Sequence, residues 1–111
     1  MQGDGFVYNE TKAGTGPVCP AGAHVTAHYH GTLADGSVFD SSVDRNEPFK
    51  FQVGVGQVIK GWDAGITQMK KGGKATLTCP AAYAYGDRGF PGLIPPNATL
   101  TFQVELIDFQ A

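Results

Sequence analysis

The sequence lacks the features that define several large classes of protein. No apolar run in its 111 residues approaches the ~20 residues of a membrane-spanning helix. Met1–Gly5 contains neither a basic stretch nor an apolar one, so we expect no signal peptide and a cytoplasmic location. The net charge is −2, and no group of basic residues exceeds the pair Lys70–Lys71, which argues against nucleic acid or a membrane as a partner.

Cysteine is also scarce. The two cysteines, Cys19 and Cys79, are too few for a disulfide framework. Cys79 alternates with apolar positions and precedes a proline, which predicts a small buried hydrophobe. Cys19 lies in a turn-rich segment, where we expect an exposed, free thiol.

Motifs for covalent or metal-assisted catalysis are missing as well. There is no Gly-x-Ser-x-Gly elbow, and no histidine is placed by sequence to activate Ser41 or Ser42. His24, His28 and His30 share one face of an alternating segment, but a further ligand and a carboxylate partner are not evident. The favoured interpretation is a solvated strand face, and we expect neither a metal ion nor another cofactor.

Glycine and proline are abundant, with 16 and 7 residues, beside a hydrophobic fraction of 41%. This balance is typical of a turn-rich, strand-rich globular protein with little helix. The length suits one domain over residues 1–111. Period-2 alternation and turn signals predict strands over residues 5–12, 24–33, 38–41, 49–53, 74–79 and 99–107.

One segment changes to a helical period, with an apolar stripe made of Ile59, Trp62, Ile66 and Met69. Gly61 and Gly65 leave one flank of this helix bare, so it can approach a sheet closely. Lys70–Lys71 would suit the dipole at its C-terminal end, and Gly72–Gly73 would stop it. A single helix covers only one sheet face. The predicted fold is therefore α+β: a five- to six-stranded antiparallel sheet curved around one short helix.

Residues 84–96 fit neither helix nor strand, because three glycines and three prolines interrupt both periods. The segment nevertheless carries four large apolar side chains: Tyr85, Phe90, Leu93 and Ile94. We interpret it as a stiff flap that lays these groups on the protein body or on a ligand. The hydroxyl of Tyr85, like the indole N–H of Trp62, needs a polar partner or a wet cleft.

Asp40 directly follows Phe39 in an apolar context, so its carboxylate needs a partner. Arg45 and Tyr29 are the candidates. Simple alternation would place Phe39 and Asp40 on opposite faces of a strand. Both can line one cleft only if the strand is bulged there, and the polar interruption at residues 42–48 favours such a bulge.

Six segments together resemble the FKBP-type peptidyl-prolyl cis–trans isomerases, the tacrolimus- and sirolimus-binding immunophilins. They are VTAHYHG (residues 25–31), DGSVFDSS (35–42), RNEPFKF (45–51), QVIKGWD (57–63), AYG (84–86) and IPPNATL (94–100). The resemblance covers the chain from about residue 14 to 109. It implies the same curved sheet on one helix that the periodicity predicts.

The resemblance also implies a site in which a prolyl ring, or the pipecolyl ring of the drugs, sits on Trp62. Tyr85 would donate its hydroxyl to a ligand carbonyl, and the backbone N–H of Ile59 would hold another. Asp40 would lie at the polar edge of the site. The other implied binding residues are Tyr29 and Arg45, which orient that carboxylate, the wall residues Phe39, Phe49, Val58 and Phe102, and the flap residues Phe90 and Ile94.

The implied activity is rotation of X-Pro bonds, which assists protein folding and needs no cofactor. The implied partners are proline-containing peptides, unfolded or client proteins, the macrolide drugs, and a phosphatase or kinase for the drug-bound form; we expect a monomer. The alternative is a binding module for proline-containing segments with little catalysis. The combination of Asp40, Tyr85 and Trp62 favours the enzyme, and a metal-dependent hydrolase using the histidine strand is poorly supported.

Overall fold

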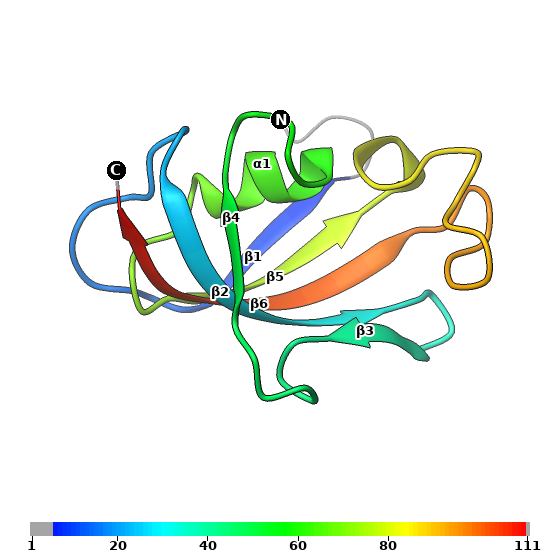
Figure 1. The fold of residues 1–111 in the computed structure, drawn as a ribbon, viewed down its shortest axis with the longest axis horizontal. Coiled ribbons are helices and arrows are strands. Elements are labelled where there is room, and N and C mark those ends of the chain that lie inside the picture. The colour runs from blue at the N-terminus through cyan, green and yellow to red at the C-terminus, as the bar shows by residue number, and fades with distance from the viewer. Residues whose placement is uncertain (1–5, 111) are drawn as a thin grey trace.

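The computed structural model describes residues 6–110, which form one sheet and one short helix around a shared core (Figure 1). The strands are β1 (Val7–Lys12), β2 (His24–Thr32), β3 (Val38–Ser41), β4 (Phe49–Gln52), β5 (Lys74–Cys79) and β6 (Leu100–Gln110). The helix α1 (Lys60–Ile66) follows β4, and a 3₁₀ turn, η1 (Ala81–Tyr83), follows β5. Residue 5 of the predicted first strand, and the segment Met1–Gly5 in which we expect no signal peptide, lie outside the described residues.

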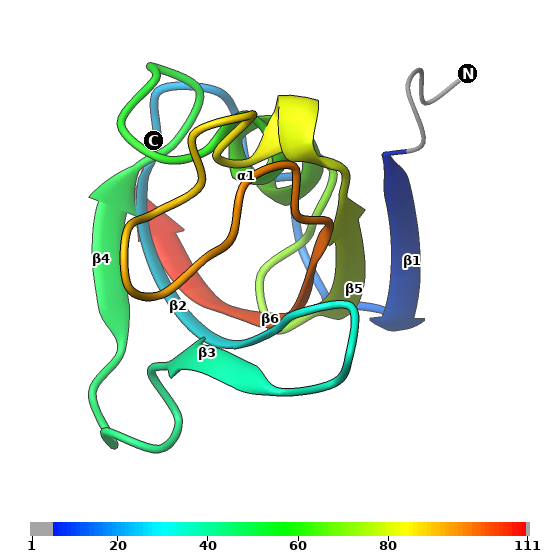
Figure 2. The ribbon, with the colours of Figure 1, turned by 90° about the vertical axis from the view of Figure 1, so that its right-hand side faces the viewer.

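The strand pairs of the described sheet are antiparallel, in the order β1-β5-β6-β2-β3, and β4 also pairs with β2. The sheet curves so that β1 and β4 stand at opposite sides with α1 between them (Figure 2). One concave face therefore packs on the helix and the convex face is left outside. The predicted α+β fold, an antiparallel sheet curved around one short helix, is confirmed.

The bare flank of α1 lets the helix lie directly on β5. A Cβ atom at Gly61 would overlap the sulfur of Cys79, and one at Gly65 would lie 2.8 Å from Cδ1 of Leu77. Trp62 follows Gly61 on this helix and is only 4% exposed. The two glycines thus set the depth at which the tryptophan sits inside the sheet.

The helix is shorter than its apolar stripe predicts, because it ends at Ile66. The expected position of Lys70–Lys71 in its last turn is wrong, and Gly72–Gly73 lie beyond its end rather than stopping it. The carbonyl of Lys71 instead accepts a hydrogen bond from the N–H of Thr15 at 2.9 Å. Pairing with a distant segment therefore replaces the last helical turns.

The same pairing buries Cys19, which is 1% exposed, so the expectation of an exposed thiol is wrong. Its N–H donates to the carbonyl of Met69 at 2.8 Å, and the preceding Val18 forms a bridge with Lys70. Cys79 is 0% exposed, and its predicted place in the core is confirmed. Both cysteines are free thiols.

The predicted bulge beside Asp40 is present in β3. Gly31 pairs with Asp40 and Thr32 pairs with Val38, so Phe39 is an extra residue with no partner in the ladder. An extra residue shifts the alternation of a strand by one position. This shift allows Phe39 and the carboxylate that follows it to reach the same cleft.

Candidate active site

A cleft of 530 Å³ opens where the start of α1 meets the concave face of the sheet and the loop that follows η1. Its lining combines aromatic rings with a few polar groups, which is the composition expected of a small-molecule or peptide site. The lining residues are Tyr29, Phe39, Asp40, Phe49, Gly56, Gln57, Val58, Ile59, Trp62, Ala84, Tyr85 and Phe102.

Trp62 forms the centre of the aromatic part of the cleft. The ring centroid of Tyr29 lies 5.0 Å from that of Trp62, with an angle of 73° between the ring planes. The ring centroid of Phe102 lies 5.3 Å from that of Trp62, with an angle of 84°. The ring centroid of Phe49 lies 5.9 Å from that of Trp62, with an angle of 68° between the ring planes. Edge-to-face packing of this kind is a favoured geometry for aromatic pairs. Trp62 and these three rings together form an apolar box, and all four line the cleft.

A glycine in β2 makes room for one wall of this box. A Cβ atom at Gly31 would lie 2.6 Å from Cζ of Phe39 and 3.2 Å from Cε1 of Phe102. Those two rings contact each other at 5.5 Å and 85°. Any larger residue at Gly31 would therefore push the Phe39 wall out of place.

The polar edge of the cleft is a network of three side chains. The hydroxyl of Tyr29 donates to Oδ2 of Asp40 at 2.5 Å, and Nη1 of Arg45 pairs with Oδ1 of the same carboxylate. Nη2 of Arg45 also donates to the hydroxyl oxygen of Tyr29 at 3.2 Å. The backbone N–H of Ser41 donates to Oδ1 of Asp40 at 2.9 Å. The carboxylate is thus fixed in one orientation.

These contacts decide the ionisation of the cleft. Burial acts to raise the pKa of Asp40, but the hydrogen bonds from Tyr29 and Arg45 outweigh it and hold that pKa below its usual range. Burial, followed by the hydrogen bond to Asp40, raises the pKa of the Tyr29 phenol. Burial and the charge of Asp40 raise the pKa of Tyr85. At neutral pH the cleft presents one carboxylate and two protonated phenols.

Two donors at the mouth of the cleft are unused. Within residues 6–110, neither the hydroxyl of Tyr85 nor the backbone N–H of Ile59 has a hydrogen-bond partner, although the Ile59 carbonyl accepts bonds from the first turn of α1. Nε1 of Trp62 is buried and has no partner among the described atoms. The cleft therefore offers hydrogen-bond donors at the edge of an apolar floor, which suits a ligand with carbonyl groups beside a small apolar ring.

The loop from β4 to α1, which forms one side of the cleft, is held by side chains that the sequence analysis did not single out. The carboxylate of Asp63 accepts bonds from the N–H groups of Gly54, at 2.7 Å, and Gly56, at 3.1 Å. Oε1 of Gln57 accepts a bond from the N–H of Gln52 at 2.7 Å. Gly56 and Gln57 line the cleft, as does Ala84, and only their closeness in sequence to Ile59 and Tyr85 could have indicated it.

The structure brings most of the predicted site residues together in the cleft and leaves three outside its lining. Arg45 reaches the site through Asp40. Phe90 is 50% exposed and lies against the ring of Tyr85, at 5.9 Å and 81°. Ile94 is 4% exposed and packs into the core, so it anchors the flap instead of covering the cleft.

Other kinds of site are not seen in the part of the chain that the structure describes. No three histidine, cysteine, aspartate or glutamate side chains among residues 6–110 are grouped so as to hold a metal ion. Over the same residues, no helix is both long enough and apolar enough to cross a membrane.

Comparison with known proteins agrees with this geometry. The family model of the FKBP-type peptidyl-prolyl cis-trans isomerases matches residues 16–107. FK506-binding protein 1 of Candida glabrata is 60% identical over 93% of this chain and 91% of its own length. Peptidyl-prolyl cis-trans isomerase Fkbp12 of Drosophila melanogaster is 62% identical over 78% of this chain and 80% of its own.

Among solved structures, the crystal structure of AtFKBP13 superposes with a TM-score of 0.91 and 43% identity. The superposition covers 97% of this chain and 95% of that one. A curved antiparallel sheet on one helix, with an aromatic cleft at the start of the helix, thus defines an FKBP-like protein. The chain belongs to the FKBP-type peptidyl-prolyl cis–trans isomerase family, and its activity is that of a peptidyl-prolyl isomerase.

Proposed function

We propose that the box over Trp62 holds the prolyl ring of an X-Pro segment, and that rotation of the X-Pro bond there assists the folding of unfolded or client proteins. The observation that carries this proposal is the arrangement of rings nearly perpendicular to Trp62 beside two unused donors. A prolyl ring is small, apolar and flanked by two carbonyl groups, so it matches both parts of the cleft.

Amide physics explains why this cleft would be sufficient. Rotation about a peptide bond costs about 18–20 kcal/mol because resonance is lost. At X-Pro both isomers are populated, and they exchange in tens to hundreds of seconds. The planar amide has a larger dipole than the twisted one, so a dry apolar box disfavours the ground state relative to the transition state. A gain of about a million-fold requires only about 8 kcal/mol.

The polar groups would then have distinct roles. The Tyr85 hydroxyl and the Ile59 N–H would each donate to a substrate carbonyl and fix the twisted chain. Asp40 would stay ionised and oriented by its two partners, which keeps the edge of the box rigid. No bond to an outside group forms or breaks in this rotation, so none of these residues has to transfer a proton.

The same cleft would bind tacrolimus (FK506) and sirolimus. Relatives that are 60% and more identical carry the name FK506-binding protein 1, and nine of the twelve implied drug contacts line this cleft. The pipecolyl ring of either drug would replace the prolyl ring on Trp62. Phe90, exposed beside Tyr85, would border the bound drug and offer apolar surface to a phosphatase or kinase that recognises the complex.

We also propose that the protein works as a monomer in the cytoplasm. Its two cysteines are free, as is usual in a reducing compartment.

A protease-free assay tests the proposal, with the exchange of an X-Pro peptide followed by NMR while tacrolimus is added. We expect faster exchange with the protein and loss of the acceleration at one equivalent of drug. Binding of the peptide without acceleration would support the alternative of a binding module. Acceleration that persists under saturating drug would show that drug and prolyl ring do not share the cleft.

A further inference from the structure

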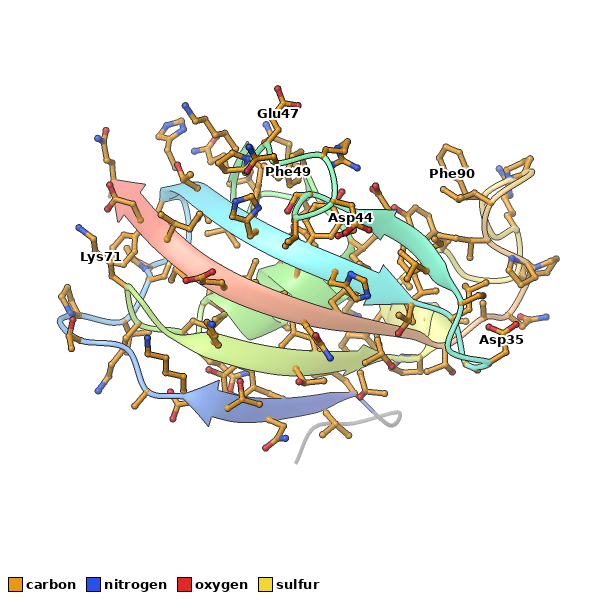
Figure 3. The ribbon with its side chains drawn as sticks, turned by 90° about the horizontal axis from the view of Figure 1, so that it is seen from below. Asp35, Asp44, Glu47, Phe49, Lys71 and Phe90 are labelled. Carbon is orange, nitrogen blue, oxygen red and sulfur yellow. The ribbon has the colours of Figure 1, made fainter. Side chains whose placement is uncertain are left out.

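The convex face of the sheet carries two histidine–serine pairs directly behind the cleft, and the function proposed above does not use them. In β2, Tyr29 lines the cleft while its neighbours His28 and His30 alternate to the outer face. Nδ1 of His28 lies 2.9 Å from the hydroxyl oxygen of Ser42, and Nδ1 of His30 lies 3.2 Å from that of Ser41. Figure 3 shows this outer face, with the loop that carries Asp44 beside β2.

Ser42 replaces a missing strand partner of Tyr29. β2 pairs with β3 as far as His30, and with β4 only from Ala27, so the peptide of Tyr29 faces the gap opened by residues 42–48. The hydroxyl oxygen of Ser42 accepts the N–H of Tyr29 at 2.8 Å, and the N–H of Ser42 donates to the Tyr29 carbonyl at 3.0 Å. Ser42 is 0% exposed, so water cannot substitute for either bond.

The Ser42 hydroxyl has two further hydrogen-bond partners in reach. The carbonyl of Tyr29 is 3.3 Å away and already accepts the N–H of Ser42, whereas Nδ1 of His28 is 2.9 Å away. The shorter contact of the Ser42 hydroxyl is therefore the one with the His28 ring on the outer face. His28 thus fixes the rotamer of the hydroxyl that holds Tyr29.

Ser41 connects the second pair to the carboxylate of the cleft. Ser41 and His30 face each other across β2 and β3, and the N–H of Ser41 donates to Oδ1 of Asp40 at 2.9 Å. The hydroxyl oxygen of Ser41 accepts the N–H of Asp44 at 3.3 Å. Residues 40–42 are therefore held from the outer face while the Asp40 carboxylate lies in the cleft.

We propose that His28 and His30 are positioning residues for the isomerase cleft: they hold Ser42 and Ser41 and so fix where Asp40 lies relative to Tyr29. The proposal rests on the proposed role of the cleft. The Tyr29–Asp40 bond joins β2 to the end of β3 on the inner side, and the histidine–serine pairs join them on the outer side. Loss of an outer pair lets the residue 40–42 segment shift, which disturbs the polar edge of the box.

The test compares variants of two histidines on the same strand. His28→Leu removes the ring nitrogen that bonds Ser42, whereas His28→Asn places an amide group, which can donate or accept, close to the position of Nδ1. His24→Leu is the matched control, because His24 is exposed on the same strand and has no hydrogen bond to a serine among residues 6–110. We expect His28→Leu to lower kcat/KM for an X-Pro peptide roughly three- to ten-fold, the factor of one neutral hydrogen bond, mainly through kcat. His28→Asn should restore most of the loss, and His24→Leu should leave the rate unchanged.

Equal activity of folded His28→Leu and wild type would overturn the proposal, as would an activity of His28→Asn no higher than that of His28→Leu.

If His28→Leu does not fold, an NMR measurement on the wild-type protein still tests the proposal. Titration of an X-Pro peptide into wild type should shift the NMR signals of the His28 ring, on the far side of the sheet, and leave those of His24 unchanged. Unchanged His28 signals at saturation with peptide would contradict the proposed positioning role of His28. The cleft is tested separately: if Trp62→Ala is inactive while His28→Leu is fully active, only this inference fails.

Discussion

Tyr29 and Asp40 are joined inside the cleft by a 2.5 Å hydrogen bond from the phenol to the carboxylate. The bond spans two neighbouring strands at the point where Phe39 bulges out of the ladder. Arg45 contacts both partners from the exposed side. An aromatic wall of the cleft and its polar edge are therefore one connected unit.

The ionisation of Asp40 should be visible in stability. Because its pKa in the folded protein lies below the ~3.9 of an unfolded aspartate, the carboxylate stabilises the fold above that value. The contribution is lost as the pH falls through the folded-state pKa. In urea unfolding, the free energy of unfolding of wild type should exceed that of Asp40→Asn at neutral pH, and the difference should shrink below about pH 4. A difference that stays constant into strong acid would contradict the network described here.

Gly31→Ala should damage the cleft specifically. The added Cβ would lie 2.6 Å from Cζ of Phe39, so that wall must move, at a cost of about 1–3 kcal/mol for overpacking. Isomerase activity should fall, and the double variant Gly31→Ala/Phe39→Leu should recover part of it. The matched control is Gly65→Ala, whose Cβ would meet Leu77 behind the helix.

Calorimetry and the exchange assay separate these two glycine variants. Gly65→Ala should lower the melting temperature with little change in kcat/KM of the folded protein, whereas Gly31→Ala should lower kcat/KM. Equal kcat/KM for Gly31→Ala and wild type would rule out the Phe39 wall as part of the site.

Neither cysteine should react while the protein is folded. Cys19 is 1% and Cys79 0% exposed, and burial raises the pKa of both thiols, that of Cys79 to about 12. Alkylation by iodoacetamide, followed by mass spectrometry, should find no label in native protein and two labels after denaturation. Rapid labelling of Cys19 in native protein would mean that its segment is not packed as described.

The sequence predicts the parts of the fold that have a local period. Alternation located β2 and β5, and Gly61 with Gly65 indicated the close approach of α1. The prediction of an exposed Cys19 failed, because hydrogen bonds to Met69 and its neighbours, far along the chain, bury the segment around this cysteine. Such pairing leaves no periodic signal in either segment.

The site was predictable to a similar extent. Trp62 and Tyr85 stand out because their polar atoms need a partner in an apolar context, and Asp40 because its carboxylate does. The hydrogen bonds from the N–H groups of Gly54 and Gly56 to the Asp63 carboxylate could not be predicted from the sequence, since an acidic residue early in a helix is ordinary. The outer histidines looked like a solvated face, since their serine partners stand at the end of the next strand, Ser41 as the last residue of β3 and Ser42 directly after it.

Tyr85→Phe should weaken ligand binding while the fold persists. The Tyr85 hydroxyl has no partner in residues 6–110, so its removal costs the folded protein no internal hydrogen bond. Affinity for tacrolimus, measured by calorimetric titration, should fall by about 1 kcal/mol, the value of one neutral hydrogen bond. Unchanged affinity would mean that the hydroxyl does not reach the ligand.

A fluorescence titration tests most directly whether Trp62 is the floor of the ligand site, because the chain has a single tryptophan. Addition of tacrolimus to wild type should change the emission of Trp62 saturably at one equivalent, and an excess of X-Pro peptide should reverse the change. Phe51→Leu is a suitable control, since Phe51 packs on Trp62 at 5.4 Å but does not line the cleft. It should retain the response. Emission that does not change while calorimetry reports drug binding would place the ligand elsewhere and contradict the account.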